Sequence, residues 1–287
     1  MSTALRQKFI DYMTLRRLSP KTQKAYTNAV AGLAAYFHKS PDTLDDDQIQ
    51  AYLLHLIKER RLAWNSCNVV FSGLRLFYGE LLKWEQPRFS IPPRPRRKRL
   101  PMLLSVQEVQ RLIDATGNPK HRTLLMTVYG AGLRVSEVVA LKPRHIESSR
   151  MMIRVDQGKG QKDRYTLLPK RLLRELRAYY ALYRPDQYLF FGRAKDSPMP
   201  VNSAQKAFYL AKKRAGITQG RGIHTLRHCF ATHLMDMGVD IYVIKHMMGH
   251  SAIKTTSAYL HTSRQKIANV ISPLDRPIAE SPGNDTF

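Results

Sequence analysis

Apolar residues in the first third of the chain recur at the three- and four-residue spacing of amphipathic helices. Three helices are expected on these apolar sets: Leu5, Phe9, Tyr12 and Met13; Tyr26, Val30, Leu33 and Phe37; and Ile49, Tyr52, Leu53, Leu56 and Ile57. Ser19 followed by Pro20 favours a helix start, and a fourth helix is expected from about Ser66 to Trp84. The pattern predicts a helical bundle, an architecture that can lie on DNA but serves many other purposes.

A second patterned region begins where Ser105 and Glu108 form a capping-box motif, beside a possible hydrophobic staple of Leu104 and Val109. Two β-rich runs, 151–155 and 165–168, flank a glycine-bearing turn and predict a hairpin. Helices are expected around 122–129, 135–141, 171–183, 203–215, 225–237, 241–248, 253–261 and 263–271. This part of the chain is therefore predicted to be mainly α with one small antiparallel β-sheet.

The two patterned regions are separated by a proline-rich, basic stretch. Residues 87–101 hold five prolines, six basic residues and no acidic residue, which favours a stiff, extended connector. We therefore predict two domains, 1–86 and 102–272, joined by the linker 87–101. The polar tail, 273–287, is expected to be disordered.

Charge narrows the range of partners. The 287 residues include 47 Lys plus Arg against 22 Asp plus Glu, a formal net charge of +25. A charge of this size points to nucleic acid, because neutralising phosphates releases counterions; a ribosomal or nucleoid packing protein is the alternative. The two cysteines, Cys67 and Cys229, allow no disulfide framework. No signal peptide or membrane span is apparent, so we expect a cytoplasmic protein.

Two kinds of metal site can be weighed from the sequence. His224 and His228 have the spacing of a metalloprotease helix, but Thr225 stands where the general-base glutamate should be. The acidic run 45–47 is explained more simply as a helix cap than as a magnesium site. We therefore predict no metal and no cofactor.

Arg134 follows two closely spaced glycines, Gly130 and Gly132, which are expected to end one helix and turn the chain. A guanidinium at the start of the next helix would suit a phosphate. The alternative is a surface arginine paired with Glu137, three residues later.

Four motifs together resemble the catalytic signatures of the tyrosine recombinases, the phage integrase family, and of its compact Xer-like members. They are G-A-G-L-R-V-S-E, G-K-G, H-T-L-R-H and G-H-S-A-I-K-T-T-S-A-Y, in that order. His224 and His250 are 26 residues apart, and Tyr259 follows His250 by nine, as in the family. The resemblance covers residues 102 to about 271, and residues 1–86 fit the family's SAM-like, core-binding helical domain by position and type.

The resemblance implies a site-specific recombinase that exchanges DNA strands through a covalent 3′-phosphotyrosine, in integration, excision or resolution. Tyr259 would be the nucleophile, Arg134 and Arg227 would hold the phosphate, and Lys159 would protonate the leaving 5′ oxygen, with Lys162 as the alternative. His224 and His250 would hydrogen-bond the phosphate, and Glu137 would support Arg134 or a histidine. His228 and His233 are expected to be structural.

The implied partners are double-stranded DNA with specific recombination sites and a homotetramer on that DNA, with or without a paralogous recombinase. We expect nucleoid association when DNA is bound. The expected DNA-binding residues are Arg94, Arg96, Arg97, Lys98, Arg99, Lys162 and Arg164. The helix expected over 263–271 would dock into a neighbouring protomer or pack in cis. A type IB topoisomerase-like enzyme and a DNA-binding protein with a decayed site stay open as alternatives.

Overall fold

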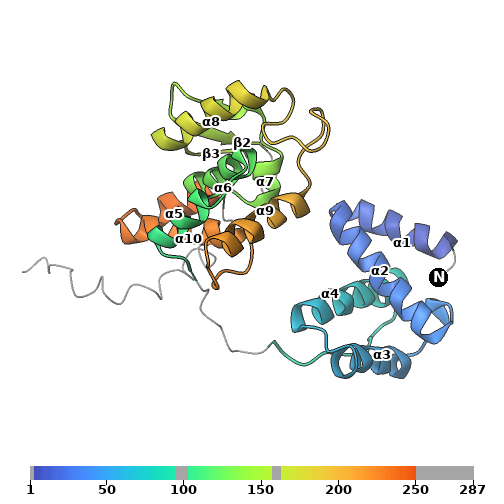
Figure 1. Ribbon diagram of the computed structural model, residues 1–287. Helices are drawn as coiled ribbons and strands as arrows, with labels where there is room; N and C mark the ends of the chain where they lie inside the picture. Colours follow the sequence, from blue (N-terminus) through green and yellow to red (C-terminus); the bar gives the residue numbers. More distant parts are fainter. Residues whose placement is uncertain (1–2, 95–102, 157–162, 250–287) are drawn as a thin grey trace, which may run out of the picture. The chain divides into compact units, whose positions relative to one another are not determined.

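The computed structural model describes residues 3–94, 103–156 and 163–249 (Figure 1). The chain divides into two compact units, 1–99 and 100–287, each with a hydrophobic core of its own. A mainly helical, two-domain fold with a small antiparallel sheet was predicted, and this is confirmed. The domain bounds 87 and 102 stay predictions.

The N-terminal unit is built from helices packed around a buried aromatic and aliphatic core. The described helices are α1 (Thr3–Leu15), α2 (Pro20–Phe37), η1 (Pro41–Thr43), α3 (Asp46–Lys58), α4 (Trp64–Arg75) and η2 (Leu76–Leu81). Ser19 caps α2 by accepting from the backbone N–H of Thr22, and Asp45 caps α3 in the same way through Gln48. Both predicted helix starts are therefore confirmed, and the acidic run acts as a cap.

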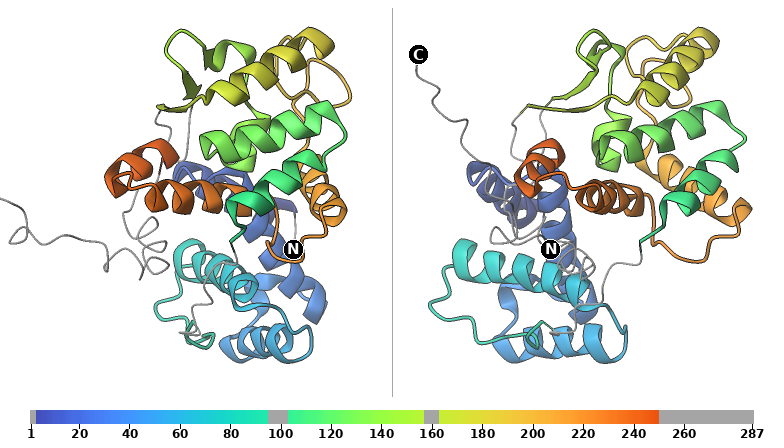
Figure 2. Two further views of the ribbon diagram at one scale, coloured as in Figure 1. Left: turned by 60° about the vertical axis from the view of Figure 1, so that its left-hand side comes forward. Right: turned by 90° about the vertical axis from the view of Figure 1, so that its left-hand side faces the viewer.

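The C-terminal unit surrounds one central helix, α6. Its described helices are α5 (Val106–Asp114), α6 (Pro119–Ala131), α7 (Val135–Val139), η3 (Pro143–His145), α8 (Lys170–Tyr183), α9 (Val201–Arg214), α10 (His224–Asp236) and α11 (Ile241–Met248). Helix α6 packs against α5, α7, α8, α9 and α10, and it buries Leu124, Leu125 and Val128. Figure 2 shows this helix, in green, among its neighbours. The capping box of Ser105 and Glu108 at the start of α5 is present as predicted.

The sheet has three antiparallel strands in the order β1-β2-β3: β1 (Ile146–Glu147), β2 (Met152–Val155) and β3 (Arg164–Leu167). The predicted hairpin corresponds to β2 and β3. The sequence did not predict β1, because two residues are too few to show a strand period.

Strand β3 reverses the usual arrangement of polar and apolar residues. Arg164 and Thr166 face inward and are buried, whereas Tyr165 and Leu167 are exposed. The hydroxyl of Thr166 donates to the carbonyl of Ala131 on α6. An inward-facing arginine on this strand is the feature on which the site depends.

The helices expected at 253–261 and 263–271, and the hairpin turn 157–162, lie outside the described residues. Within the described ranges, every helix is too short or too polar to cross a membrane.

Candidate functional site

The turn between α6 and α7 places Arg134. Gly132 has a φ of +63°, in the left-handed region that glycine tolerates best. A Cβ at this position would lie 2.3 Å from Cδ1 of Phe230, so α10 can approach the turn only because no side chain is there. The chain then extends through Leu133 and leaves Arg134 at the N-cap of α7, as predicted.

Arg134 is held by three polar contacts. Its Nη1 lies 2.6 Å from Oε1 of Glu137, and its Nη2 donates to the carbonyl of Gly249 at 3.0 Å. Oε2 of Glu137 also accepts from the backbone N–H of Arg134 at 2.8 Å. The pairing with Glu137 that the alternative interpretation expected is present, but the Arg134 side chain is only 20% exposed.

Arg227 reaches the same place from α10. Its side chain is 4% exposed, and its Nη1 donates to the carbonyl of Gly132 at 2.6 Å. Its Nη2 donates to the carbonyl of Met248 at 2.5 Å, and Nη1 lies 3.6 Å from Oε2 of Glu137. Two arginines that are 93 residues apart in sequence thus share one carboxylate.

Arg164 is a third guanidinium on Glu137. Its Nη1 and Nη2 contact the two carboxylate oxygens of Glu137 at 3.0 and 2.8 Å, and its Nε donates to the carbonyl of Met247 at 2.7 Å. The side chain is 5% exposed. Arg164 is thus buried, with donors turned onto protein acceptors in the interior; the DNA contact expected of it stays a prediction.

Glu137 is ionised in this setting. Burial raises its pKa, but the hydrogen bonds and charge of Arg164, with the hydrogen bonds from Arg134, reverse this and hold the pKa at about 2. Three guanidiniums against one carboxylate leave the cluster with an excess of two positive charges. The cluster is therefore suited to an anion.

His224 lies in the first turn of α10, exposed and close to the arginines. Partial loss of hydration, Arg227 and Arg134 lower its pKa below the usual histidine value, although Glu137 raises it, and the net shift favours the neutral imidazole. His233 bridges the hydroxyl of Tyr129 and the carbonyl of Leu104, in agreement with a structural role.

The sequence comparisons agree with this arrangement. Residues 103–266 match the model of the phage integrase family, and residues 5–88 match the phage integrase N-terminal SAM-like domain. A putative integrase/recombinase, y4qK, of Sinorhizobium fredii is 37% identical over 98% of this chain and 92% of its own. The chain belongs to the phage integrase family.

Further matches place it among the tyrosine recombinases of this family. The tyrosine recombinase XerA of Thermococcus kodakarensis is 34% identical over 88% of this chain and 89% of its own. A crystal structure of a lambda integrase tetramer bound to a Holliday junction shares the fold, with 16% identity and a TM-score of 0.73. That match covers 89% of this chain and 76% of the other.

The structure therefore brings together Arg134, Glu137, His224 and Arg227 of the residues that the family resemblance selected. Arg94, an expected DNA contact, is exposed in the N-terminal unit, with its guanidinium 5.8 Å from the ring centre of Trp64. The remaining predicted residues lie outside the described part of the chain: Arg96, Arg97, Lys98, Arg99, Lys159, Lys162, His250 and Tyr259. Lys159 falls in the connection between β2 and β3, whose residues Val155 and Arg164 are paired.

The sequence analysis also weighed metal sites and the two cysteines. In the described ranges, no three side chains of His, Cys, Asp or Glu are placed to hold a metal ion. Cys229 is buried, and burial raises the pKa of its thiol to about 11. The thiol is therefore protonated and structural, and its Sγ accepts from the backbone N–H of Leu104.

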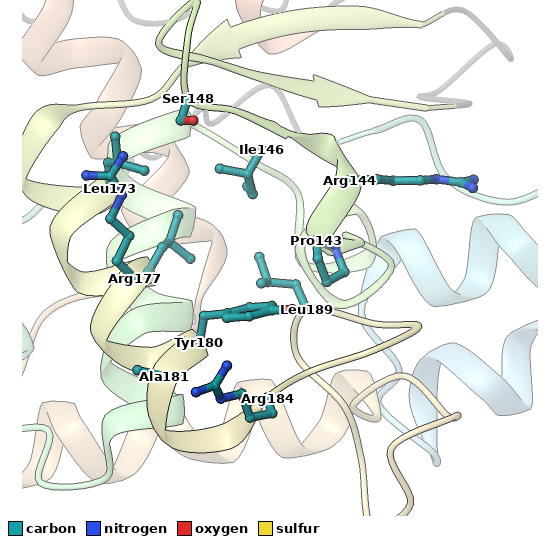
Figure 3. Close-up of a pocket in the computed structure, with 11 residues that line it drawn as sticks. Pro143, Arg144, Ile146, Ser148, Leu173, Arg177, Tyr180, Ala181, Arg184 and Leu189 are labelled. Carbon is teal, nitrogen blue, oxygen red and sulfur yellow. The ribbon is translucent and has the colours of Figure 1, made fainter.

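A cavity of about 470 Å³ lies elsewhere in this recombinase domain, between α8 and the segment around η3 (Figure 3). Leu173 and Tyr180 of α8 line it together with Ile146 and Leu189. None of the described site residues lines this cavity. The arginine cluster on Glu137 is thus the part of the domain that concentrates the predicted chemistry.

Proposed function

We propose that this tyrosine recombinase is site-specific and cuts and rejoins DNA through a 3′-phosphotyrosine formed on Tyr259. The observation that carries the proposal is the convergence of Arg134 and Arg227 on Glu137, beside His224. Planar guanidiniums held rigidly at one place are the groups best suited to binding the non-bridging oxygens of a scissile phosphate.

In the proposed reaction, Oη of Tyr259 attacks phosphorus, a Tyr–O–P bond forms, and the bond from phosphorus to the 5′ oxygen breaks. Lys159 supplies the proton that the leaving 5′ oxygen takes up. The phenol must lose its own proton, and the neutral imidazole of His224 is able to accept one. Because the tyrosyl ester conserves the energy of the broken phosphodiester, attack by a 5′ hydroxyl reverses these steps and reseals the strand.

Of the three backbone carbonyls that accept from Arg134 and Arg227, two, those of Gly249 and Met248, lie at the end of helix α11. The next residue in the chain is His250, the second histidine that we propose to contact the phosphate. The arginines are thus anchored to the segment that leads into the last motif. This continuity supports placing His250 and Tyr259 in the same site as the arginines.

We further propose that the recombinase acts as a tetramer on two DNA duplexes with specific sites, with the helix expected over 263–271 docked into a neighbouring protomer. The fold shared with a lambda integrase tetramer bound to a Holliday junction supports this assembly. The basic linker around Arg94 and Arg96–Arg99 supplies cations for the DNA backbone. We propose a cytoplasmic protein that joins the nucleoid when it is bound to DNA.

Tyr259→Phe tests the nucleophile. With a nicked DNA substrate that carries the recombination site, the wild-type protein should form an SDS-resistant protein–DNA adduct. The Tyr259→Phe protein should bind the same DNA but form no adduct, because phenylalanine has no oxygen to attack phosphorus. Tyr242→Phe is the matched control, since Tyr242 is 65% exposed on α11 and outside the cluster.

Persistence of the adduct in Tyr259→Phe would refute the assignment. Strand exchange between two labelled duplexes separates the recombinase from a topoisomerase-like enzyme, which would reseal without exchanging partners. Absence of an adduct from the wild-type protein on every candidate site would favour the decayed DNA-binding protein.

A further inference from the structure

Arg164 lies outside the four sequence motifs, but its side chain contacts the motif residue Glu137. It is the first residue of β3, it lies inside the domain, and its guanidinium forks onto both oxygens of Glu137. Its Nε is bound by the carbonyl of Met247 at the end of α11. Three donors of one arginine thus join three separate parts of the chain: β3, α7 and α11.

The side chain of Arg164 packs closely against Gly249, which has no side chain of its own. A Cβ on Gly249 would lie 2.9 Å from Cδ and 3.0 Å from Nε of Arg164, and the φ of +61° also favours glycine. The carbonyl of the same glycine accepts from Arg134. Gly249 therefore contacts both guanidiniums, that of Arg164 by close approach and that of Arg134 through its carbonyl.

The carboxylate of Glu137 accepts hydrogen bonds from two arginines at once, Arg164 and Arg134. Oε1 contacts Nη1 of both Arg164 and Arg134, and Oε2 contacts Nη2 of Arg164 and the backbone N–H of Arg134. If Arg164 were absent, Glu137 would be free to turn both oxygens toward Arg134 and Arg227. A bidentate pair of that kind would take up the donors that a phosphate needs.

Electrostatics points the same way. Apart from burial, which raises the pKa of Glu137, the strongest influences on that carboxyl are the hydrogen bond and the charge of Arg164, and both lower it. Arg164 is thus the main counter-ion of Glu137, and Arg134 keeps more of its charge for a ligand.

We propose that Arg164 is a positioning residue for cleavage, which holds Glu137 in the orientation that leaves Arg134 and Arg227 aimed at the scissile phosphate. Its contact with Met247 fixes β3, the strand after the turn that carries Lys159, against the end of α11, the helix before His250. The inference rests on the proposed cleavage reaction.

The test measures single-turnover cleavage of a nicked substrate at saturating protein, alongside DNA affinity. Arg164→Met removes the fork and keeps the length of the side chain, and Arg164→Lys keeps the charge but cannot contact both oxygens. We expect Arg164→Met to lower the cleavage rate constant at least about tenfold, by analogy with loss of a preorganising contact, and to change DNA affinity less than about threefold. Arg164→Lys should fall between Arg164→Met and wild type.

Arg122→Met is the matched control, because Arg122 is also ion-paired, with Glu175, in the same unit but outside the cluster. It should cleave at the wild-type rate. All rates are taken well below the melting temperature of each variant, measured by circular dichroism. If Arg164→Met does not fold, Arg164→Lys decides the test.

A double-mutant cycle with Glu137→Gln separates positioning from general packing. If Arg164 acts through Glu137, its replacement should slow cleavage in the wild-type background but change it less than about twofold in the Glu137→Gln background. The inference would be overturned if the two substitutions slowed cleavage by factors that multiply in the double mutant. It would also be overturned if Arg164→Met lowered DNA affinity as much as the cleavage rate. Failure of the proposed function itself is distinguishable, because wild type would then form no adduct on any substrate.

Discussion

Glu137→Gln removes the negative charge at the centre of the arginine cluster and keeps the size of the side chain. Glu137 is 8% exposed, and its carboxyl contacts Arg134 and Arg164 directly. We expect the substitution to lower the free energy of unfolding of the C-terminal unit, because the buried guanidiniums of Arg164 and Arg227 and the half-buried one of Arg134 would then face a neutral amide.

The magnitude follows from the pKa. Burial raises the pKa of Glu137, but Arg164 and Arg134 lower it from 4.5 to about 2, and each pKa unit corresponds to about 1.4 kcal/mol. The ionised carboxylate of Glu137 therefore contributes about 3 kcal/mol to the free energy of unfolding. Since the folded pKa is depressed, this contribution is fully present above about pH 4.5 and is lost as the pH falls through about 2. The free energy of unfolding of wild type should exceed that of Glu137→Gln by about 3 kcal/mol at pH 7 and by roughly half of that at pH 3.

Urea unfolding followed by two probes measures this difference. Both tryptophans, Trp64 and Trp84, lie in the N-terminal unit, so tryptophan fluorescence follows that unit alone and serves as an internal control. Far-UV circular dichroism follows helices of both units. Glu137→Gln should shift the transition seen only by circular dichroism and leave the fluorescence transition unchanged.

Glu175→Gln is the matched control, because Glu175 pairs with Arg122, whose side chain is 41% exposed. A pair open to solvent should contribute no more than about 1 kcal/mol. The reasoning would be refuted by a loss for Glu137→Gln as small as that of the control at pH 7, or by a loss that is the same at pH 3.

Two further predictions concern the arginines and the turn that places them. Arg134→Ala and Arg227→Ala should each slow cleavage on the order of 10²-fold or more and weaken DNA binding much less, as gel shift and adduct formation would show; equal losses in both would make them ordinary phosphate contacts. Gly132→Ala should destabilise the protein by about 2–4 kcal/mol, through a left-handed alanine and a clash with a ring of α10. Gly216→Ala, with a φ of +65° and nothing within 4 Å, should cost about 1 kcal/mol in urea unfolding; equal costs would contradict the clash.

The helices could be predicted from the sequence because a helix cap depends on residues only three positions apart. Ser19 and Asp45 cap their helices through neighbours three residues away, and Ser105 does the same with Glu108. The pairing of Arg134 with Glu137 is also local, since it spans three residues. Spacing along the sequence is therefore enough to predict these caps and this ion pair.

The contacts of Arg164 could not be predicted in this way. Its partners, Glu137 and Met247, are 27 and 83 residues away along the chain. The strand pattern was also misleading, because Tyr165 and Leu167 look like the buried side of β3 but are exposed. From sequence alone, an arginine in a basic hairpin favours a DNA contact. Only the packing of α7, β3 and α11 around one carboxylate shows that it faces inward.

A buried acid in a site for phosphate is explained by the charges around Glu137. Three guanidiniums alone would repel one another at this distance, and Glu137 holds them together while leaving an excess of two positive charges. In the proposed reaction, the phosphodiester brings one negative charge, and the oxygen of Tyr259 adds negative charge as it loses its proton. We therefore expect the cluster to match the charge of the transition state better than that of the bound DNA, which is the condition for faster cleavage rather than tighter binding.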